Sequence, residues 1–359
     1  MPSKSEAVLI AGGYGVVGEQ IAACLRRRYP DLPLVLAGRS RSRGEAVAAR
    51  LGHATATVMD VTRPHPLGEL IPRAVVGAVN DPGDHLLKDA IRLGVPIVDI
   101  TRWTARLRAS ARAVAGLAPR SPVLLASGWM AGLASVAAVA ASRPLQRVES
   151  IAISVLYALQ DRAGPNSAAY MDRLATPFEV MQAGARQTVL PFTDPRRITF
   201  PDGQEARVYR FDTPDQLLLP RSTGAASVAA RIGFDSAATT RILALLVRSG
   251  LWKRISGERF TDLRRALLFH PGPGASHQIV VDADGLDPSG EARSVRATLS
   301  DPLGQTHLTA VGALVQLERL LGLDGAAPPP PGLAYPDSAP QIQAARRTLE
   351  RFGVSMTLA

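Results

Sequence analysis

The sequence predicts an α/β protein in which a doubly wound parallel sheet is joined to a second α/β domain with a mixed or antiparallel sheet. Three observations support this fold class. Residues 7–126 alternate short apolar runs with helical patterns. After Ser142 the strand candidates are longer and are joined by segments that contain proline and glycine. The chain has 359 residues, which is more than one hydrophobic core usually accommodates, so about two domains are expected.

The first domain alternates strands and helices. The expected elements are strand 7–11, helix 18–29, strand 34–37, helix 43–51, strands 56–59 and 74–79, helix 83–93, strand 96–100, helix 104–117 and strand 122–126. The strand segments are apolar at consecutive positions rather than at every second one. Strands of that kind belong to a parallel sheet covered by helices on both faces.

The second domain carries longer strand candidates at 148–157 and 278–283. Alternating polar and apolar residues at 207–211 and 293–299 indicate strands with one solvated face. Two helices are expected, at 167–184 and 237–249. The second of these carries a stripe predicted to face the core, consisting of Ile242, Leu243, Leu245 and Leu246.

The C-terminal segment begins with a linker, Ala326–Pro331, that consecutive prolines make stiff. A helix at 339–352 and a strand at 354–358 follow. Because a helix and then a strand repeat the pattern of the first domain, we expect this segment to return there and extend or cap its sheet. The expected divisions are therefore 1–128, 129–323 and 324–359.

Composition narrows the classes of partner. The net charge is +10, but only three of the 41 basic residues are lysine, no dense basic block occurs, and aromatic residues make up 5% of the chain. Nucleic acid is therefore not expected as a partner. The uncharged stretch 121–142 has the length of a membrane span, yet its Pro, Gly and Ala content favours a strand, a glycine turn and a helix.

Cysteine usage bears on the compartment. Cys24 is the single cysteine, which excludes a disulfide framework and a Cys-rich zinc site. The N-terminal residues run directly into the first strand without a long apolar segment, so no secretory signal is expected. We expect a cytoplasmic protein.

The strongest motif is Gly13-x-Gly15-x-x-Gly18, which follows the first strand and opens the first helix. Glycines at these positions permit a tight turn, close approach of the backbone to a pyrophosphate, and packing of the helix on the strand. The helix N-terminus supplies amide hydrogens to the phosphates. The motif predicts a Rossmann-type dinucleotide site whose contacts are Gly13, Tyr14, Gly15, Val16, Val17 and Gly18.

The end of the second strand indicates which dinucleotide is bound. An NAD site would place a carboxylate there for the ribose 2′-hydroxyl, whereas this chain has Arg39, Ser40 and Arg41. A guanidinium and a hydroxyl suit a 2′-phosphate, so the predicted cofactor is NADP. Asp60, after the third strand, would border the adenine, although a helix N-cap in Asp60-Val61-Thr62 is an equally good interpretation.

Candidate catalytic groups follow the fourth and fifth strands. Asn80 is placed to contact the nicotinamide ribose, and Asp99 or His85 to manage a proton. Thr101 and Arg102 are further candidates for binding substrate. For each of these residues, helix capping or loop hydrogen bonding is an alternative.

The second domain adds the loop Phe269–His277, in which His277 is a candidate proton donor near neutral pH. A rigid turn holding satisfied His270 and His277 is the favoured alternative. Nothing nearby supplies further metal ligands, so no metal is expected. Three arginines are candidate clamps for a substrate carboxylate: Arg207, Arg210 and Arg221.

Two classes of dehydrogenase are excluded. Short-chain dehydrogenases need Tyr-x-x-x-Lys, and no lysine here has a tyrosine four positions before it. Zinc-dependent alcohol dehydrogenases need several cysteine ligands.

The sequence resembles the saccharopine dehydrogenase-like NAD(P)-dependent oxidoreductases. The resemblance covers about the first 140 residues well and rests on the stretches 10–18, 36–40, 90–101 and 127–133. It implies a Rossmann domain followed by a substrate and dimerisation domain, a homodimer, and hydride transfer at a carbon bonded to nitrogen. One departure is that Ala131 stands where many members have proline, so the substrate is expected to differ from that of the amino-acid-cleaving members.

These observations together predict a cytoplasmic NADP-dependent oxidoreductase that acts on an imine or secondary amine of a small or medium substrate. Two alternatives stay open. One is a trans-acting enoyl or carbonyl reductase of lipid or polyketide synthesis, whose arginine-rich surface would dock an acidic carrier protein. The other is a redox sensor that binds NADP without turnover.

Overall fold

The computed structural model describes residues 5–162, 170, 172–261, 272 and 274–359. The chain forms two compact units, each built from two segments. The first unit comprises Met1–Gly132 and Thr309–Thr348, and the second Leu133–Leu308 and Leu349–Ala359.

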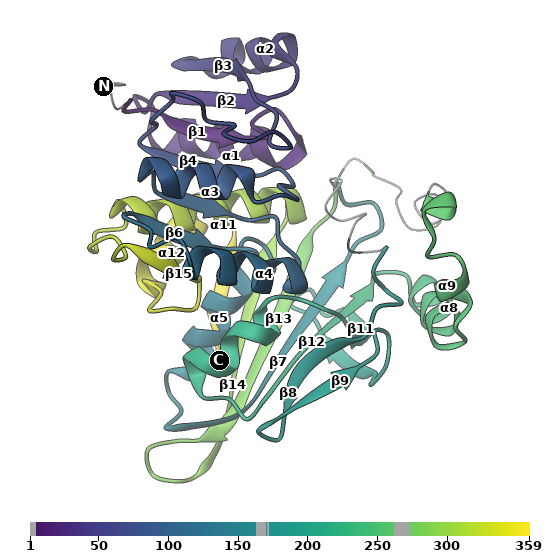
Figure 1. The fold of residues 1–359 in the computed structure, drawn as a ribbon. Helices are drawn as coiled ribbons and strands as arrows, with labels where there is room; N and C mark the ends of the chain where they lie inside the picture. Colours follow the sequence, from purple (N-terminus) through teal and green to yellow (C-terminus); the bar gives the residue numbers. More distant parts are fainter. Residues whose placement is uncertain (1–4, 163–169, 171, 262–271, 273) are drawn as a thin grey trace. The chain divides into compact units, whose positions relative to one another are not determined.

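The first unit contains a seven-stranded parallel sheet in the order β15-β6-β5-β4-β1-β2-β3 (Figure 1). Its strands are β1 (Val8–Ala11), β2 (Leu34–Gly38), β3 (Ala54–Val58), β4 (Ala74–Gly77), β5 (Ile97–Asp99), β6 (Pro122–Leu125) and β15 (Gly332–Ala334). The strand order reverses at β1, which has β2 on one side and β4 on the other. In sheets of this type, ligands bind beyond the carboxyl ends of the strands at such a reversal.

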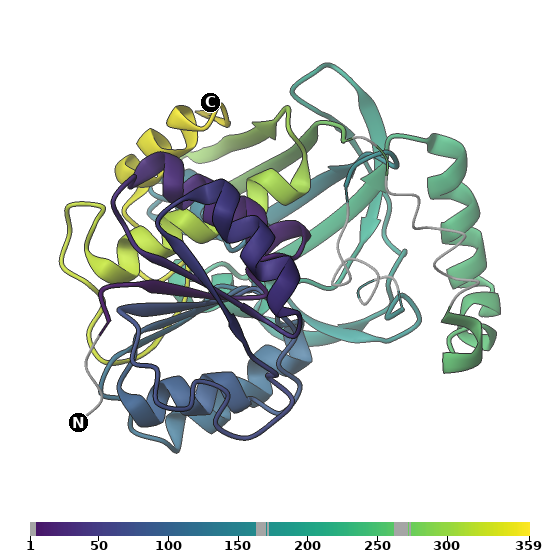
Figure 2. The same cartoon turned by 90° about the horizontal axis from the view of Figure 1, so that it is seen from above.

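Helices cover both faces of this sheet. Figure 2 shows α1 (Val16–Arg28) and α2 (Arg41–Leu51) on one side, and α3 (His85–Leu93) and α4 (Thr104–Ala115) on the other. The central strands lie between two helical layers and have no face toward water, which explains their unbroken apolar sequences. The edge strand β3 alternates alanine and threonine, and its Val58 is 53% exposed. Val8, Leu9 and Ile10 of β1 have no exposed surface. The predicted doubly wound sheet is confirmed.

The chain re-enters the first unit along α11 (Gln305–Leu321), a helix that the sequence analysis did not place. Glu318 on α11 accepts hydrogen bonds from Arg28 (3.0 Å) and Tyr29 (2.7 Å) at the end of α1. Beyond the proline run, β15 adds to the edge of the sheet beside β6, in the register Leu333 to Val123. The sheet extension predicted for the C-terminal segment is thus made by β15.

The last strand corrects the other part of that prediction. After α12 (Ile342–Arg351), β16 (Ser355–Leu358) pairs antiparallel with β14 (Ala292–Asp301) of the second sheet. Met356 is buried, whereas Ser355 and Thr357 on either side of it are exposed. A strand that alternates in this way suits a sheet with one solvated face, and not a sheet buried between two helical layers.

The second unit is built on a mixed sheet in the order β10-β11-β12-β7-β13-β14-β16. Its other strands are β7 (Arg147–Tyr157), β10 (Arg196–Thr199), β11 (Glu205–Arg210), β12 (Ser227–Phe234), β13 (His277–Leu286) and β14 (Ala292–Asp301). β7 and β12 run parallel, and the remaining neighbours are antiparallel. The predicted mixed sheet is confirmed.

Helices of the second unit pack on this sheet. The elements are α5 (Leu133–Ser142), α7 (Asp215–Thr223), α8 (Ala237–Arg248), α9 (Leu251–Arg254) and a 3₁₀ turn at Glu258–Phe260. α5 contacts β13 and β14, α7 contacts β12, and α8 contacts β11 and β12. α5 follows β6 in the chain after a glycine turn, as expected for the apolar stretch 121–142.

The helix predicted at 167–184 is wrong over residues 172–184, of which 172–177 form a turn and an irregular segment. Residues 178–182 form β8 (Phe178–Gln182), which pairs with β9 (Ala185–Val189) in a separate hairpin. The turn consists of Ala183 and Gly184, and both have positive φ (48° and 77°). Such a two-residue turn has the twist that flanking strands require, so the turn geometry overrides the helical pattern. Part of the predicted helix lies outside the described residues.

The stripe predicted to face the core on α8 is partly wrong. The buried residues of α8 are Thr240, Leu243 and Ala244, spaced three and four apart. Ile242 and Leu245 point away from the sheet and are 59% and 67% exposed. A helix that packs on a sheet buries only one face. Here that face includes the polar Thr240 and excludes the apolar Ile242 and Leu245, so apolar residues alone do not identify it.

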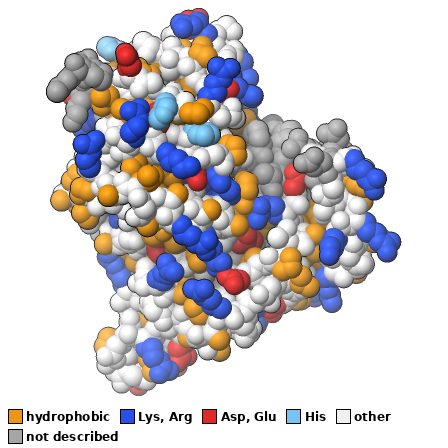
Figure 3. All heavy atoms as spheres, in the orientation of Figure 1, with side chains coloured by type: hydrophobic (Ala, Val, Ile, Leu, Met, Phe, Trp, Pro, Cys, Tyr) orange, Lys and Arg blue, Asp and Glu red, His pale blue; other side chains and the backbone are white. Residues whose placement is uncertain are grey.

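No helix in the described part of the chain is both long and apolar enough to cross a membrane. On the face drawn in Figure 3, Lys and Arg side chains are scattered singly among apolar and acidic ones. The basic excess is therefore not gathered into one patch on that face.

Candidate functional site

The loop between β1 and α1 lies at the reversal point of the first sheet. The amides of Gly12 and Gly13 donate to the carbonyl of Ala37 (2.8 and 3.3 Å), and the amide of Gly15 donates to the carbonyl of Gly12 (2.9 Å). α1 begins at Val16, with Gly15 as its N-cap and no side chain capping its first amides. These amides carry the positive end of the helix dipole and can bind an anion.

The glycines of this loop have separate roles. Gly12 adopts a φ of +83°, so it makes the tight turn that the sequence analysis assigned to Gly13. A Cβ on Gly18 would lie 2.0 Å from the carbonyl oxygen of Gly12, so α1 can approach the loop only without a side chain there. A Cβ on Gly15 would meet only the carbonyl oxygen of Gly12, at 3.2 Å, so the outer side of Gly15 is open for a ligand.

Tyr14 ties this loop to the end of β2. Its hydroxyl accepts a hydrogen bond from the amide of Ser40 (2.6 Å). A Cβ on Gly38 would lie 2.4 Å from the Tyr14 hydroxyl oxygen, and one on Gly44 would lie 3.2 Å from the ring, so both glycines make room for the ring. The guanidinium of Arg43 lies over the same ring, 5.5 Å from its centre.

Three arginines surround the start of α2. Arg39, Arg41 and Arg43 are exposed, and no acidic residue lies in the first turn of the helix. Ser40 is the N-cap, and its hydroxyl oxygen accepts from the amide of Arg43 (3.4 Å). Arg41 is partly engaged by Glu45 at 3.7 Å. Sequence reasoning missed Arg43, although the alternation of arginines through positions 39, 41 and 43 was a visible signal.

Asp60 and Asn80 border the same edge of the sheet. The carboxylate of Asp60 accepts hydrogen bonds from the amide and hydroxyl of Thr62 (3.0 and 2.7 Å). These hydrogen bonds lower the pKa of Asp60, with smaller contributions from Arg63 and Arg39. Residues 61–64 form a turn and no helix begins there, so Asp60 caps a turn and the alternative interpretation as a helix N-cap is wrong. Asn80 is exposed just beyond β4.

A buried ion cluster lies behind Asn80. Arg102, which is 3% exposed, pairs with Asp84 and with Asp99 (2.8 Å), and its guanidinium lies 3.9 Å from Asp81. Burial acts to lower the pKa of Arg102, but Asp99 and Asp84 outweigh it, so the pKa is raised. The cluster joins the loops after β4 and β5, and it holds the start of α3 through Asp81, whose carboxylate accepts from the amide of His85 (2.8 Å).

This cluster changes the interpretation of Asp99 and His85. Asp99 is 1% exposed, and its second carboxylate oxygen accepts from the amide of Thr101 (3.0 Å), so its hydrogen-bonding capacity is directed to Arg102 and the loop. That arrangement suits positioning and not proton transfer. His85 is half-buried in the first turn of α3, with its ring against Gly83.

His277 does not fit the role of a proton donor near neutral pH. It begins β13 in the second unit and has no exposed surface. Burial lowers the pKa of His277 to about 3, because the charged imidazolium loses its hydration. Its Nδ1 lies 3.9 Å from Asp161, a carboxyl whose pKa burial raises to about 6. His270 lies outside the described residues.

The three predicted carboxylate clamps have different surroundings. Arg210 is buried and pairs with Asp194 (3.0 Å), to which Arg231 also binds, so Arg210 has a structural partner. Arg221 is exposed near the end of α7. Arg207 lines a hollow described below. Among the described residues, no group of His, Cys, Asp and Glu could hold a metal ion.

The turn after β6 has an unusual backbone. Met130, Ala131 and Gly132 all have positive φ (54°, 53° and 82°). Proline is fixed near −65° and cannot adopt the backbone conformation of Ala131, so this turn excludes proline at position 131.

A comparison with solved structures supports the architecture. Saccharopine dehydrogenase (L-Glu forming) from Saccharomyces cerevisiae matches with a TM-score of 0.71 at 15% sequence identity, over 98% of this chain and 99% of that chain. The chain shares the fold of saccharopine dehydrogenase. This agrees with the resemblance found in the motifs and with the predicted two-domain α/β class.

Other likenesses are more distant. A myo-inositol dehydrogenase from Corynebacterium glutamicum matches with a TM-score of 0.44 at 12% identity, over 99% of each chain. No protein-family model matches the sequence, and a comparison with curated protein sequences finds no match.

Proposed function

We propose that the protein is an NADP-dependent oxidoreductase that transfers hydride between nicotinamide and a C=N or C–N centre of a small or medium substrate. The observation that carries the cofactor assignment is the pairing of two features at one sheet edge. One is the uncapped N-terminus of α1 beneath a glycine loop, and the other is the group of arginines at the start of α2. The substrate class is supported by the shared fold with saccharopine dehydrogenase.

The residues present fit the cofactor. The amides that open α1 would hold the pyrophosphate, and Gly15 leaves space for it to approach. Arg39 and Arg43, with the hydroxyl of Ser40 or Ser42, would hold a 2′-phosphate. Residues 37–43 contain no carboxylate that would repel such a phosphate.

When bound, the nicotinamide supplies or accepts the hydride. The chain's own residues bind and orient. Asn80 is exposed beyond β4, next to the loop, and would contact the nicotinamide ribose. Arg102 and its carboxylates fix the two loops that follow β4 and β5, so the positioning of donor and acceptor carbons rests on a buried ion cluster.

The shortage of suitable proton donors supports a C=N substrate over a ketone. Asp99 is committed to Arg102, and the imidazole of His277 is neutral at ordinary pH. Of the predicted proton donors, His85 is left. An iminium already carries the positive charge that a ketone acquires only when an acid protonates it, so it makes less demand on such a donor.

The cofactor assignment is tested by titrating the protein with NADPH and NADH and following nucleotide fluorescence or heat. NADPH should bind more tightly. In the Arg39→Ala Arg43→Ala protein, the affinity for NADPH should fall about tenfold to a hundredfold, since hydrogen bonds to charged groups contribute about 1.5–3 kcal/mol. The affinity for NADH should change little. Arg112→Ala is the matched control, because Arg112 is an exposed arginine on α4 of the same unit.

Tighter binding of NADH by the unmodified protein would refute the NADP assignment. Saturable binding of neither nucleotide would refute the oxidoreductase assignment as well. The substrate class is tested by NADPH oxidation with a cyclic imine, an enone and a ketone. The imine should react fastest, and turnover of the enone alone would contradict the C=N proposal.

A further inference from the structure

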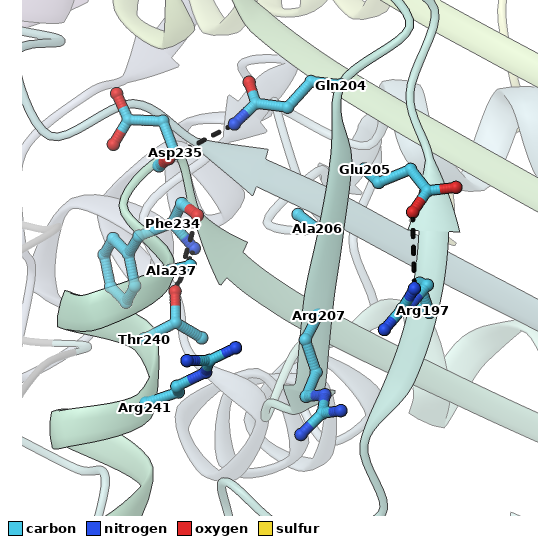
Figure 4. A pocket seen from close by; sticks show the side chains of 10 residues that line it. All are labelled: Arg197, Gln204, Glu205, Ala206, Arg207, Phe234, Asp235, Ala237, Thr240 and Arg241. Carbon is cyan, nitrogen blue, oxygen red and sulfur yellow. Dashed lines mark hydrogen bonds and ion pairs between the residues drawn. The ribbon is translucent and has the colours of Figure 1, made fainter.

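A hollow of about 250 Å³ opens in the second unit between β10, β11 and the start of α8 (Figure 4). Three arginines line it: Arg197 from β10, Arg207 from β11 and Arg241 from α8. Ala237 and Thr240, in the first turn of α8, form part of its wall. Pockets for drug-sized ligands measure about 300–1,000 Å³, so this hollow suits a small molecule or one end of a larger one.

The strand pairing places two of these arginines directly opposite each other. Arg197 and Arg207 are partners in the antiparallel register of β10 and β11, so their side chains stand side by side on one face of the sheet. Like charges in that arrangement destabilise the pair of strands. Glu205 lies 3.6 Å from Arg197 and offsets its charge. In Figure 4 the Arg197–Glu205 pair lies to one side, and Arg207 lies between that pair and Arg241.

The charges of Arg207 and Arg241 are not offset by a neighbouring carboxylate in this way. Neither forms an ion pair with any carboxylate in the part of the chain that the structure describes. The other acidic residue of the hollow, Asp235, accepts a hydrogen bond from the amide of Leu159 (3.2 Å). In Figure 4 its carboxylate lies at the opposite end of the hollow from the two guanidinium groups.

The start of α8 adds positive potential to the same wall. α8 has 12 residues and no acidic residue in its first turn. Its N-cap hydroxyl, from Ser236, accepts from the amide of Thr239 (3.2 Å), which leaves the amides of Ala237 and Ala238 without a side-chain cap. Free amides at a helix N-terminus favour an anion. Two exposed guanidinium groups that pair with no described carboxylate therefore line this hollow beside the first turn of α8, and Asp235, which precedes the N-cap of that helix, lines its other end.

We propose that this hollow binds a small dianion of the phosphate-monoester type, held by Arg207 and Arg241 at the start of α8. A guanidinium can bind two oxygens of a phosphate at once, and two guanidinium groups from different elements match the charge of a dianion. The ligand would relieve the repulsion among the three arginines and join β11 to α8. This site is separate from the proposed cofactor loop, because every residue that lines it belongs to the second unit.

The experiment measures thermal unfolding of the full-length protein as inorganic phosphate is added at constant ionic strength. Phosphate should raise the melting temperature of the unmodified protein in a saturable way, as expected for a ligand that binds only the folded state. The Arg207→Gln Arg241→Gln protein should lose at least tenfold in apparent affinity. Arg248→Gln is the matched control, because Arg248 is exposed at the far end of the same helix and does not line the hollow.

Phosphate can also bind the arginines beside α2, so the titration is repeated in the Arg39→Ala Arg43→Ala protein, where the response that depends on Arg207 and Arg241 should persist. An equal response of the Arg207→Gln Arg241→Gln protein and its parent would overturn the site. Stronger stabilisation by malonate than by phosphate would overturn the phosphate assignment. The readout needs no nucleotide, so its failure leaves the cofactor proposal standing.

Discussion

Replacing Gly18 with alanine tests how the first helix meets the phosphate-binding loop. The new Cβ would lie 2.0 Å from the oxygen and 2.7 Å from the carbon of the Gly12 carbonyl, and 3.0 Å from the Cα of Gly13. All three are backbone atoms, so no side-chain rotation relieves the overlap. An ordinary contact needs about 3.4 Å or more, so α1 must move outward by more than about 1 Å at its first turn.

A shift of that size carries the amides of Val16 and Val17 out of hydrogen-bonding range of a pyrophosphate, because such bonds weaken steeply beyond about 3.2 Å. Two lost charge-assisted bonds correspond to about 3–6 kcal/mol, or a loss in NADPH affinity of about 10²-fold to 10⁴-fold. The affinity is measured by calorimetric titration of variants whose folding circular dichroism has verified.

Gly116→Ala is the matched control in the same unit. Gly116 has an ordinary helical φ of −83°, and a Cβ there would meet its nearest neighbour at 3.6 Å. This variant should bind NADPH like the parent. If a folded Gly18→Ala protein also binds NADPH with parental affinity, the cofactor does not rest on the start of α1, and the reasoning from this loop is wrong.

Three further predictions follow from single contacts. Tyr14→Phe removes the acceptor for the Ser40 amide and should weaken NADPH binding about fivefold, with NADPH titration as the measurement; an unchanged affinity would show that this bond does not order the start of α2. Arg102→Met leaves Asp99 buried without its cation and Asp84 with Arg106 (2.9 Å) as its remaining partner, and it should lower the free energy of unfolding by about 3–5 kcal/mol in urea titrations; a loss below about 1 kcal/mol would contradict the buried-cluster argument. The pKa of His277 is about 3 in the folded protein, below its value of about 6.5 in the unfolded chain. The contribution of the buried neutral imidazole to the free energy of unfolding is therefore complete above about pH 6.5 and is lost as the pH falls from there toward 3. Relative to His277→Asn, the parent should therefore lose about 2 kcal/mol of unfolding free energy between pH 7 and pH 5, and parallel stability curves would contradict the burial of a neutral imidazole.

Local pattern was sufficient for the first unit. The runs around Val8–Ala11 and Leu34–Gly38 are apolar at every position, and only a sheet covered on both faces buries such strands completely. Glycine spacing likewise identified the loop at 13–18, because the steric demand of a helix pressed on a strand is met by residues close in sequence. The assignment of the turn to Gly13 failed by one position, since only the backbone angle distinguishes it from Gly12.

The charged residues were predicted less well because their partners lie far away in sequence. Asp99 lies at the end of a strand, where a catalytic acid is often found. In the structure it forms an ion pair with Arg102, which also pairs with Asp84. His277 resembled a titratable loop residue, and its burial at the start of β13 removes its titration from neutral pH. Arg207 and Arg210 lie three positions apart on one strand, but Arg210 meets Asp194 and Arg207 faces a hollow.

The sequence by itself determined the doubly wound sheet, the glycine loop and the basic residues after the second strand, because each depends on periodicity or on neighbours within a few positions. Only the tertiary structure decided which ionisable groups are buried in pairs, where the last strand pairs, and that Arg197 and Arg207 stand opposite each other beside Arg241. The physical reason is that the charge state and partner of a side chain depend on dielectric and distance, and both are set by segments that meet only when the chain folds.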